Sequence, residues 1–301
     1  MKIENVADLQ VLIQTARTGS LTGAAGVMGV TPAAASAMLK RLERQLDTRL
    51  FERSTRAMRL TSQGQTLLDY ASRAFDLVAE GTAQVTADRA ELVGTLRVAA
   101  PSDLTRSVML PWFDAFLGEH PGLRLSLTVG DRTLDVVRDE VDVAIRYGAL
   151  ADSRLVARPL ARTRPILSAS PAYLARHPAP ETPQDLLRHN CLVFDRGGRP
   201  HRLWRFQRDG QWTEVRVDGD RRADDASLAR AWAVAGAGIL LKSPIDQHAE
   251  LARGELVPLL QAWQTEPYPL HALLPSGRFV PTRVRALVDF LAAKFAAFAD
   301  D

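Results

Sequence analysis

One stretch of the sequence carries small and basic side chains at a spacing that suits contact with duplex DNA. Small apolar groups can meet thymine methyls, a hydroxyl can bond a base edge or a phosphate, and cations can bond phosphates. A helix that begins after Thr31 would present the small groups on its leading turns and the cations about two turns later. The candidate DNA contacts are Thr31, Ala33, Ala34, Ser36, Lys40 and Arg41.

Two short helices joined by a tight turn would position these side chains. Ser20 can cap a first helix, and Gly29 can adopt a positive φ and end it. Thr31 can cap a second helix, and Pro32 suits its first position because the N–H that it lacks has no partner there. The pattern predicts a helix-turn-helix whose second helix enters the DNA major groove. An ordinary αα-hairpin that serves only as scaffold is the alternative.

A basic hairpin is predicted after the second helix. Asp47 tolerates the left-handed conformation that can end a helix. Leu50–Phe51 and Met58–Leu60 have the pattern of two short strands around the sequence Arg-Ser-Thr-Arg. A basic hairpin in this place is typical of a wing, so we expect Arg53 and Arg56 to touch phosphates or to enter a minor groove.

The positive charge of the chain is concentrated in the same region. The 301 residues are 46% apolar and 24% charged, which is the profile of a soluble globular protein of two or three domains. The net charge is only +3, yet residues 1–60 hold nine Lys/Arg against five Asp/Glu and carry +4. This excess coincides with the predicted contact to a polyanion, although a solvated basic face would carry the same charge.

A long helix, about residues 62–90, is predicted after the hairpin. Ser62 and Gln65 have the spacing of a capping box at its start. Apolar and small residues then recur in alternating steps of four and three, which is a heptad seam that favours dimerisation. Packing of the helix on its own domain is the alternative. The seam residues are Leu67, Ala71, Ala74, Val78, Gly81 and Val85.

From residue 94 onward, strand and helix patterns alternate to the end of the chain. Such alternation implies a mainly parallel sheet with helices on both faces. In open α/β sheets, ligands bind beyond the carboxyl ends of strands, near helix N-termini. The stretches that qualify are Pro101–Asp103, Gly130–Arg132, Arg146–Gly148 and Asp224–Asp225.

Ser102 and Arg146 supply the chemistry for a ligand in these stretches. Ser102 offers a hydroxyl and an amide at a helix start, and Arg146 offers a two-pronged donor for a carboxylate. The alternatives are purely structural roles, in which Ser102 and Asp225 only cap helices and Arg146 pairs with Asp131. Asp224 would disfavour an anionic ligand, so the sequence leaves the charge of the ligand open.

The N-terminal 60 residues resemble the DNA-binding domain of LysR-type transcriptional regulators. AAGVMGVTPAAAS, LERQLDTRLFER and RLTSQG carry the similarity, and LFER…RLT after the helix pair is its most specific motif. The sequence departs from the family at two positions. The family often has Gly at Asp47, and it often has a basic or long polar residue at Ala37, so one DNA contact of the family lacks its side chain here.

The resemblance extends to the C-terminus through VGDRTLD, DVAIRYG, LARTRPILSASPAYL and DDASLARAWAVAGAGILL. It implies an α/β protein with an all-α-type winged helix-turn-helix domain over 1–60 and a linker helix with its hinge over 61–93. An effector-binding domain like a periplasmic binding protein would follow over 94–301. Its first subdomain would take about 94–162 and 271–301, and its second about 163–270.

The resemblance also implies a function. The chain would bind double-stranded DNA as a dimer or a dimer of dimers, a homotetramer, and could meet RNA polymerase. A small polar effector bound in the crevice between the subdomains would modulate operator binding or activation. The expected effector contacts are Ser102, Asp131, Arg146, Tyr147, Ser168 and Asp224.

Enzyme and membrane interpretations find little support. The six histidines lack metal-ligand spacing, and Cys191, the only cysteine, excludes a disulfide framework and suits a buried hydrophobe. Gly236–Leu241 lacks the third glycine of a dinucleotide loop. The apolar run Trp232–Leu241 is too short to span a bilayer, and the N-terminus lacks a signal core.

We therefore expect a cytoplasmic protein that is not an enzyme and holds no cofactor or metal. Two other interpretations stay open. One is a solute-binding module whose N-terminal hairpin serves only protein contacts, and the other is an enzyme with an uncatalogued crevice site.

Overall fold

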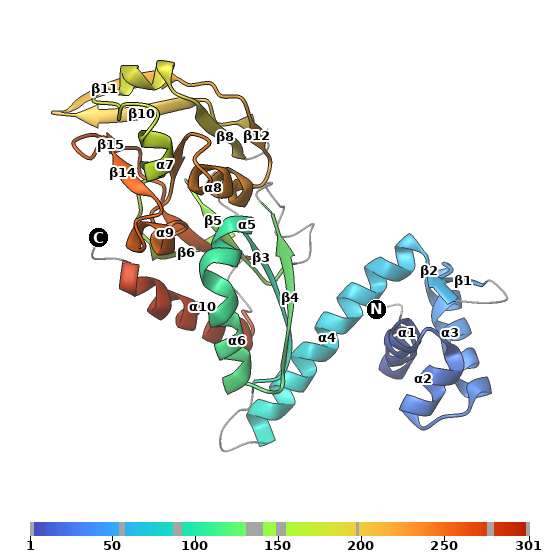
Figure 1. The fold of residues 1–301 in the computed structure, drawn as a ribbon. Coiled ribbons are helices and arrows are strands. Elements are labelled where there is room, and N and C mark those ends of the chain that lie inside the picture. Colours follow the sequence, from blue (N-terminus) through green and yellow to red (C-terminus); the bar gives the residue numbers. More distant parts are fainter. Residues whose placement is uncertain are drawn as a thin grey trace. The chain divides into compact units, whose positions relative to one another are not determined.

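The computed structural model describes residues 3–53, 58–86, 92–130, 141–148, 155–196, 199–275 and 280–298. The chain divides into two compact units, Met1–Glu91 and Leu92–Asp301. Figure 1 draws the first unit in blue to cyan and the second in green to red.

Three helices, a two-stranded hairpin and a long fourth helix make up the first unit. The hairpin strands are antiparallel, with Phe51 opposite Leu60. The tip between the strands, which the sequence predicts to be a basic wing, lies outside the described residues. The elements are α1 (Val6–Thr18), α2 (Leu21–Met28), α3 (Pro32–Leu46), β1 (Phe51–Arg53), β2 (Met58–Leu60) and α4 (Ser62–Thr86).

Local capping explains where these helices begin and end. The hydroxyls of Ser20 and Thr31 each accept a hydrogen bond from the amide three residues later, at the starts of α2 and α3. Gly29 ends α2 at φ 66°, and Asp47 ends α3 at φ 50°. The caps and the left-handed ends predicted from the sequence are confirmed.

Apolar residues from all three short helices fill the core of the first unit. Leu12, Leu39 and Leu42 are almost fully buried, together with Leu50 from the segment before β1. Ala35 is also buried, because the small residues of α3 allow the helices to approach closely. Helices α1 and α3 therefore each bury one apolar face in this core.

Helix α4 begins at Ser62, as predicted, but the residue that caps it differs from the prediction. The predicted capping box of Ser62 and Gln65 is wrong, because Thr61 already leaves the hairpin in position to cap the helix. Its hydroxyl accepts a hydrogen bond from the Gly64 N–H at 2.9 Å. A Cβ at Gly64 would lie 2.0 Å from the Leu50 carbonyl oxygen, so glycine permits this close packing of α4 on the first unit.

The second unit contains two mixed sheets. The first has the strand order β4-β3-β5-β16-β6, in which β3 is parallel to β4 and β5, and β16 is antiparallel to its neighbours. We refer to it as sheet I. Its strands are β3 (Gly94–Ala100), β4 (Leu123–Val129), β5 (Val143–Tyr147), β6 (Leu155–Ala161) and β16 (Leu270–Pro275).

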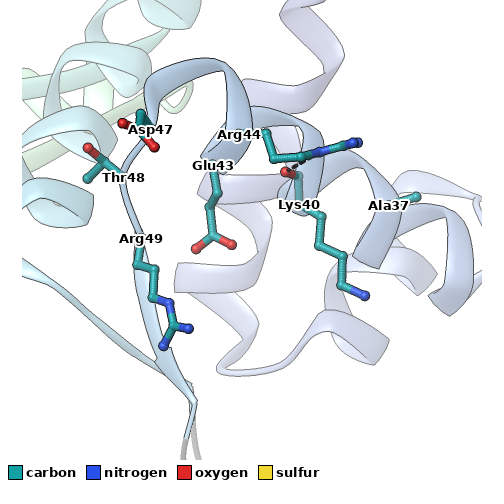
Figure 2. A pocket seen from close by; sticks show the side chains of 7 residues that line it. All are labelled: Ala37, Lys40, Glu43, Arg44, Asp47, Thr48 and Arg49. Carbon is teal, nitrogen blue, oxygen red and sulfur yellow. Dashed lines mark hydrogen bonds between the residues drawn. The ribbon is translucent and has the colours of Figure 1, made fainter.

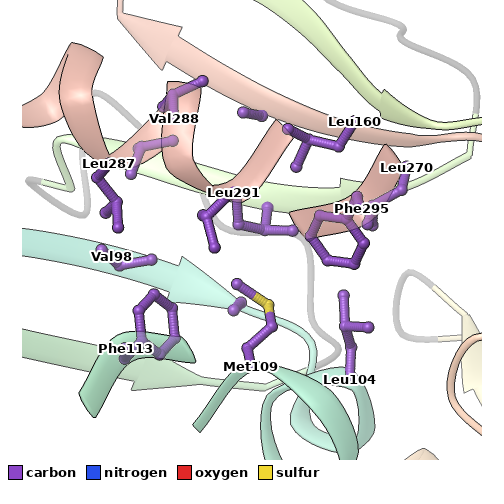
Figure 3. Packing of buried hydrophobic residues seen from close by; sticks show 14 of the residues in the cluster. Val98, Leu104, Met109, Phe113, Leu160, Leu270, Leu287, Val288, Leu291 and Phe295 are labelled. Atoms are coloured by element: carbon purple, nitrogen blue, oxygen red, sulfur yellow. The ribbon is translucent and has the colours of Figure 1, made fainter. Parts of the chain in front are cut away.

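Helices pack on sheet I, and the apolar side chains between the helices and the sheet form a hydrophobic core. Figure 3 shows Leu287, Leu291 and Phe295 of the C-terminal helix gathered with Val98 of β3 and Phe113 of α6. The helical stretch after β3, predicted as one helix, includes a turn of π-helix. The helices are α5 (Ser102–Leu104), the π-turn (Thr105–Met109), α6 (Leu110–Glu119), α10 (Thr282–Phe295) and a closing 3₁₀ turn (Ala296–Phe298).

The second mixed sheet, sheet II, has the order β12-β8-β13-β7-β14, and β9 pairs with β8. Its strands are β7 (Ile166–Ala169), β8 (Cys191–Arg196), β9 (Arg199–Pro200), β12 (Arg222–Ala223), β13 (Ile239–Lys242) and β14 (Val257–Leu259). A separate three-stranded sheet has the order β11-β10-β15 and consists of β10 (Leu203–Arg208), β11 (Gln211–Arg216) and β15 (Gln264–Thr265). The helices of this part of the chain are α7 (Pro171–Leu174), a 3₁₀ helix (Pro183–Arg188), α8 (Ala226–Val234) and α9 (His248–Ala252).

The expectation of mainly parallel sheets is wrong. The chain leaves sheet I after β6 and returns as β16, so each sheet receives strands that run against their neighbours. Ser168 lies in β7, and the helix that follows begins at Pro171 after the cap Ser170. Asp209 and Gly210 form the turn between β10 and β11, with φ of 51° and 79°.

No single helix in the described ranges is long and apolar enough to cross a membrane. Helices α2 and α3 pass such a test together on length and composition, with a bend of 106° between them.

Candidate functional site

One face of α3 is exposed along its whole length. Ala33, Ala37, Lys40 and Arg44 are exposed in steps of four, three and four residues, which places them on one side of the helix. We call these four residues the α3 face. Because the opposite side is buried in the core, the α3 face presents small groups first and cations last.

The α3 face borders a recess of about 690 Å³. Figure 2 shows Lys40 and Arg44 on α3 and Arg49 on the segment that follows it. The Glu43 carboxylate also lines the recess, and its Oε1 accepts the amides of Leu50 and Phe51 at 2.8 and 3.4 Å. The lining residues are Ala37, Lys40, Glu43, Arg44, Asp47, Thr48 and Arg49.

Arg41, expected to contact DNA, is instead committed to Asp8 on α1. Its Nε and Nη2 donate to the two carboxylate oxygens at 2.6 and 2.5 Å, and Asp8 is fully buried. The hydrogen bond to Asp8 and the charge of that carboxylate raise the pKa of Arg41. This two-pronged ion pair joins α3 to α1. It neutralises the charge of Arg41, which the sequence predicts to contact a DNA phosphate.

The other predicted DNA contacts are placed as follows. Thr31 is exposed at the cap of α3, and Ala34 and Ser36 are half-buried beside the α3 face. Arg53 ends β1, and Arg56 lies outside the described residues. Sequence reasoning missed Arg44 and Arg49. The first follows Lys40 by one helical turn and could have been found, whereas the second depends on how the chain turns at Asp47.

The predicted heptad seam divides along α4. Leu67 packs on the core of the first unit and Ala71 is buried, so the first part of the seam packs on its own domain. Further along, Tyr70, Leu77 and Val78 are 60, 47 and 65% exposed, and the small residues Ala74 and Gly81 are exposed with them. We call Tyr70, Ala74, Leu77, Val78 and Gly81 the α4 stripe.

In the second unit, Ser102 and Asp225 join the two sheets. The Ser102 hydroxyl donates to Asp225 Oδ1 at 2.7 Å, and Asp225 also caps α8 through the Ser227 amide at 2.8 Å. Arg106, in the π-turn, donates to the other carboxylate oxygen at 2.9 Å. Burial acts to raise the pKa of Asp225, but these hydrogen bonds outweigh it and lower the pKa to about 2. Asp225 is therefore both a cap, as expected, and a bridge.

A buried charge network lies beside this bridge. Asp103 pairs with Arg230 of α8 at 2.9 Å and with Lys242 of β13 at 3.2 Å. Lys242 also pairs with Asp246 at 2.8 Å, and the Tyr147 hydroxyl donates to the same carboxylate at 2.8 Å. Burial raises the pKa of Asp246 and holds that of Tyr147 well above 10. We call the region around Ser102, Asp225 and this network the subdomain junction.

The remaining predicted effector contacts are only partly brought together. Arg146 donates to the Gly130 carbonyl at 3.2 Å, at the end of β4. Ser168 is fully buried and donates to Gln247 at 2.6 Å, so its hydroxyl is engaged inside sheet II. Asp224 is exposed, and Asp131 lies outside the described residues. Within the part of the chain that the structure describes, no three His, Cys, Asp or Glu side chains gather to hold a metal ion.

Arg196, in the second unit, is a further residue that the sequence did not single out. It ends β8, and its guanidinium lies 4.3 Å from the ring centroid of Tyr268, which itself stacks on Tyr147. A signal for it was present, because Arg196 ends a strand just as Arg146 does. What sets Arg196 apart from other arginines at strand ends is the pair of aromatic rings around it, which the sequence does not show.

Comparisons with known proteins agree with this architecture. Residues 89–296 match the LysR substrate binding domain, and residues 6–65 match the bacterial regulatory helix-turn-helix protein of the lysR family. The chain is 30% identical to the HTH-type transcriptional activator TtdR of Escherichia coli K12 over 286 residues, which cover 95% of this chain and 92% of TtdR. It is 32% identical to the HTH-type transcriptional regulator CrgA of Neisseria meningitidis over 289 residues, covering 95% and 96%.

Solved structures agree as well. The structure of CrgA matches with a TM-score of 0.63 at 30% identity, covering 97% of this chain and 99% of CrgA. The full-length virulence activator AphB of Vibrio cholerae matches with a TM-score of 0.59 at 28% identity, covering 96% and 99%. These matches confirm the fold class and the family that the sequence motifs indicated. The chain belongs to the LysR family and is a DNA-binding transcriptional regulator with a helix-turn-helix domain followed by an effector-binding α/β domain.

Proposed function

We propose that this regulator reads its operator through the α3 face and that an effector bound at the subdomain junction modulates the binding. The observation that carries the proposal is the order of side chains on the α3 face. Small groups lie on the leading turns, where a recognition helix meets base edges, and cations lie further along, where the groove wall places phosphates.

Roles follow for the individual DNA contacts. Lys40, Arg44 and Arg49 bond phosphates, and Arg53 and Arg56 add phosphate or minor-groove contacts from the wing. Thr31, Ala33, Ala34 and Ser36 meet base edges. Replacing Ser36 with Ala is expected to cost about 1–3 kcal/mol on the operator and much less on random DNA. Equal losses on both would assign Ser36 to the backbone instead.

The α4 stripe is the interface of a homodimer. Two exposed large apolar residues, Leu77 and Val78, lie one turn from the small residues Ala74 and Gly81, a composition that lets two helices approach closely. Dimers pair two DNA half-sites, and two dimers form the tetramer. We place this assembly in the cytoplasm, where it contacts RNA polymerase and performs no catalytic step.

The subdomain junction is the effector site. Ser102, Tyr147 and Asp225 come from both sheets, so a ligand that touches them favours one arrangement of the subdomains over another. Binding reaches the DNA only through a difference in ligand affinity between two states, and a coupling of about 1–3 kcal/mol is usual. Arg146 and Asp224 lie at strand ends of the same unit, and Asp131 follows β4 in the sequence.

The test begins with selection of DNA fragments from the source genome that the full chain retains. Fluorescence anisotropy on a selected fragment is then repeated with candidate metabolites. The expected result is a steep salt dependence on the fragment and a change in affinity with at least one metabolite. A chain that retains no fragment above random DNA would contradict the proposal.

A further inference from the structure

Arg196 lies between two aromatic rings, and no carboxylate of the described residues bonds it. Its guanidinium is 4.3 Å from the Tyr268 centroid and 5.5 Å from the Phe194 centroid. The Nε atom is buried, and it has no hydrogen-bond acceptor among the described residues. Other arginines of the second unit, such as Arg222 and Arg230, are paired with carboxylates at 2.8–2.9 Å.

The nearest carboxylates are already engaged. Asp246 is bound by Lys242 and by the Tyr147 hydroxyl, both at 2.8 Å. Glu266 is paired with Arg205 at 3.0 Å. Although both carboxylates act on Arg196 from a distance, neither bonds it in the described structure, and burial lowers its pKa. An arginine stays protonated under any such shift, so one positive charge remains without a bonded counter-charge.

The neighbouring histidine adds no second charge. Burial and the Arg196 charge lower the pKa of His201 to about 4, so His201 is neutral at pH 7. Its backbone amide bonds the Phe194 carbonyl at 3.2 Å, which holds the loop after β9 against β8. The Lys242 ammonium also lies near Phe194, 5.1 Å from the ring centroid, but it is paired with Asp103 and Asp246. Of these two cations, Arg196 is the one that no carboxylate of the described residues bonds, so the site matches a ligand with one negative charge.

A guanidinium whose buried Nε lacks an acceptor among the described residues carries a free-energy cost that an incoming anion can relieve. A guanidinium matches a carboxylate with two parallel hydrogen bonds. We propose that Arg196 is the anchor for the effector, and that the effector is a small monocarboxylate. The proposal rests on the effector function proposed for the subdomain junction, and it assigns to Arg196 the role that the sequence had suggested for Arg146.

The position of Arg196 explains how such a ligand would be sensed. Tyr268 stacks on Tyr147 with ring centroids 5.4 Å apart, and Tyr147 bonds Asp246 in the buried charge network. Tyr147 belongs to sheet I, whereas Arg196 and Asp246 belong to the sheet II part of the unit. A carboxylate on Arg196 therefore acts on the contacts that join the two sheets.

Thermal shift and calorimetry on the full chain test the proposal with defined probes. The probes are acetate, pyruvate, lactate and benzoate, each compared with its neutral amide, and sulfate as a dianion. At least one carboxylate should raise the melting temperature of the wild type, and its amide and sulfate should not. Arg196→Gln should weaken binding of that carboxylate by about 10- to 100-fold, and Arg196→Lys by less.

Arg208→Gln is the matched control. Arg208 also lies over an aromatic ring, at 5.6 Å from the Trp263 centroid, but its side chain is half-exposed on the hairpin. This variant should bind the carboxylate as the wild type does. Failure of all four carboxylates to bind the wild type would overturn the proposal, as would undiminished binding by both Arg196 variants.

Operator binding separates the two proposals. If the carboxylate binds through Arg196 but never changes the operator affinity of the wild type, the anchor stands and the effector function of the junction fails. If another metabolite changes operator affinity equally in wild type and Arg196→Gln, the effector function stands and the anchor is wrong.

Discussion

The hydroxyl of Ser102 lies 2.7 Å from Asp225 Oδ1, although 123 positions separate the two residues in the chain. The sequence left open the alternative that each residue only caps a helix of its own subdomain. The bond instead joins the helix start after β3 to the cap of α8, so the two subdomains meet at a carboxylate. That carboxylate is charged, and its charge can be removed by titration.

Asp225→Asn should destabilise the second unit in a pH-dependent way. The pKa of Asp225 is about 2 in the folded chain and near its ordinary value of 3.8 in the unfolded chain. Between these two pKa values the unfolded chain therefore binds more protons than the folded chain. The carboxylate's contribution to the free energy of unfolding is complete above about pH 4 and is lost as the pH falls toward 2. Urea unfolding should show a wild-type advantage that is constant from pH 7 to 5 and shrinks below pH 4.

Asp209→Asn, in an exposed hairpin turn, is the control for that series. Its difference from wild type should not follow the same pH curve. An advantage of wild type over Asp225→Asn that grows on acidification would show that the charge of Asp225 does not stabilise the junction.

Lys40→Gln and Arg41→Gln should differ in their effect on DNA binding, although each removes one charge from neighbouring positions. Lys40 is exposed on the α3 face, so its loss should reduce the slope of log K against log salt by about one unit. Arg41 is bound to buried Asp8, so its loss should leave the slope unchanged and lower the melting temperature. Equal slopes for both variants would contradict the assignment.

Ala37→Lys should increase affinity for DNA. Ala37 lies on the exposed α3 face beside the recess that Lys40 and Arg44 line, so a lysine there meets open space. We expect tighter binding to operator and random DNA alike, with a steeper salt slope by about one unit. A control substitution of Ala37 by Gln should leave the slope unchanged, and a Lys variant with the wild-type slope would place the recess away from the phosphates.

Val78→Glu should dissociate the dimer. Val78 is 65% exposed on the α4 stripe, and a glutamate there would put like charges face to face in a desolvated interface. Analytical ultracentrifugation should show smaller species for this variant. Ala79→Glu, one residue further round the helix, should keep the wild-type assembly. An unchanged assembly in Val78→Glu would mean that other surfaces hold the oligomer together.

Local features of this fold were predictable from the sequence. Caps depend on residues two or three positions apart, so Ser20, Thr31 and Asp225 could be placed without knowledge of the fold. The buried faces of the helices followed from the helical period in the same way. The cap formed by Thr61 was not predicted, because the path of the preceding strand determines which hydroxyl reaches the first turn of α4.

Long-range pairing was not predictable. Arg41 and Asp8 are 33 residues apart. The residues around Arg41 indicate an exposed cation, and those around Asp8 indicate an ordinary acid near the N-terminus, so the sequence does not predict their ion pair. Ser168 reads as a helix start, yet strand pairing with β13 and β14 places it in sheet II. Arg196 differs from other arginines only because the carboxylates near it are already bonded to other residues. Those bonds exist only in the folded unit, so the sequence cannot show them.

The most direct test of the account is operator binding by Ala33→Asp. Ala33 is exposed in the first turn of α3, where an acid favours the helix because it lies at the positive end of the helix dipole. The same acid would face DNA phosphates and base edges if the α3 face enters the groove. Our prediction is a melting temperature no lower than that of wild type and loss of specific binding to a selected genomic fragment in fluorescence anisotropy. Binding of that fragment at wild-type affinity would contradict it.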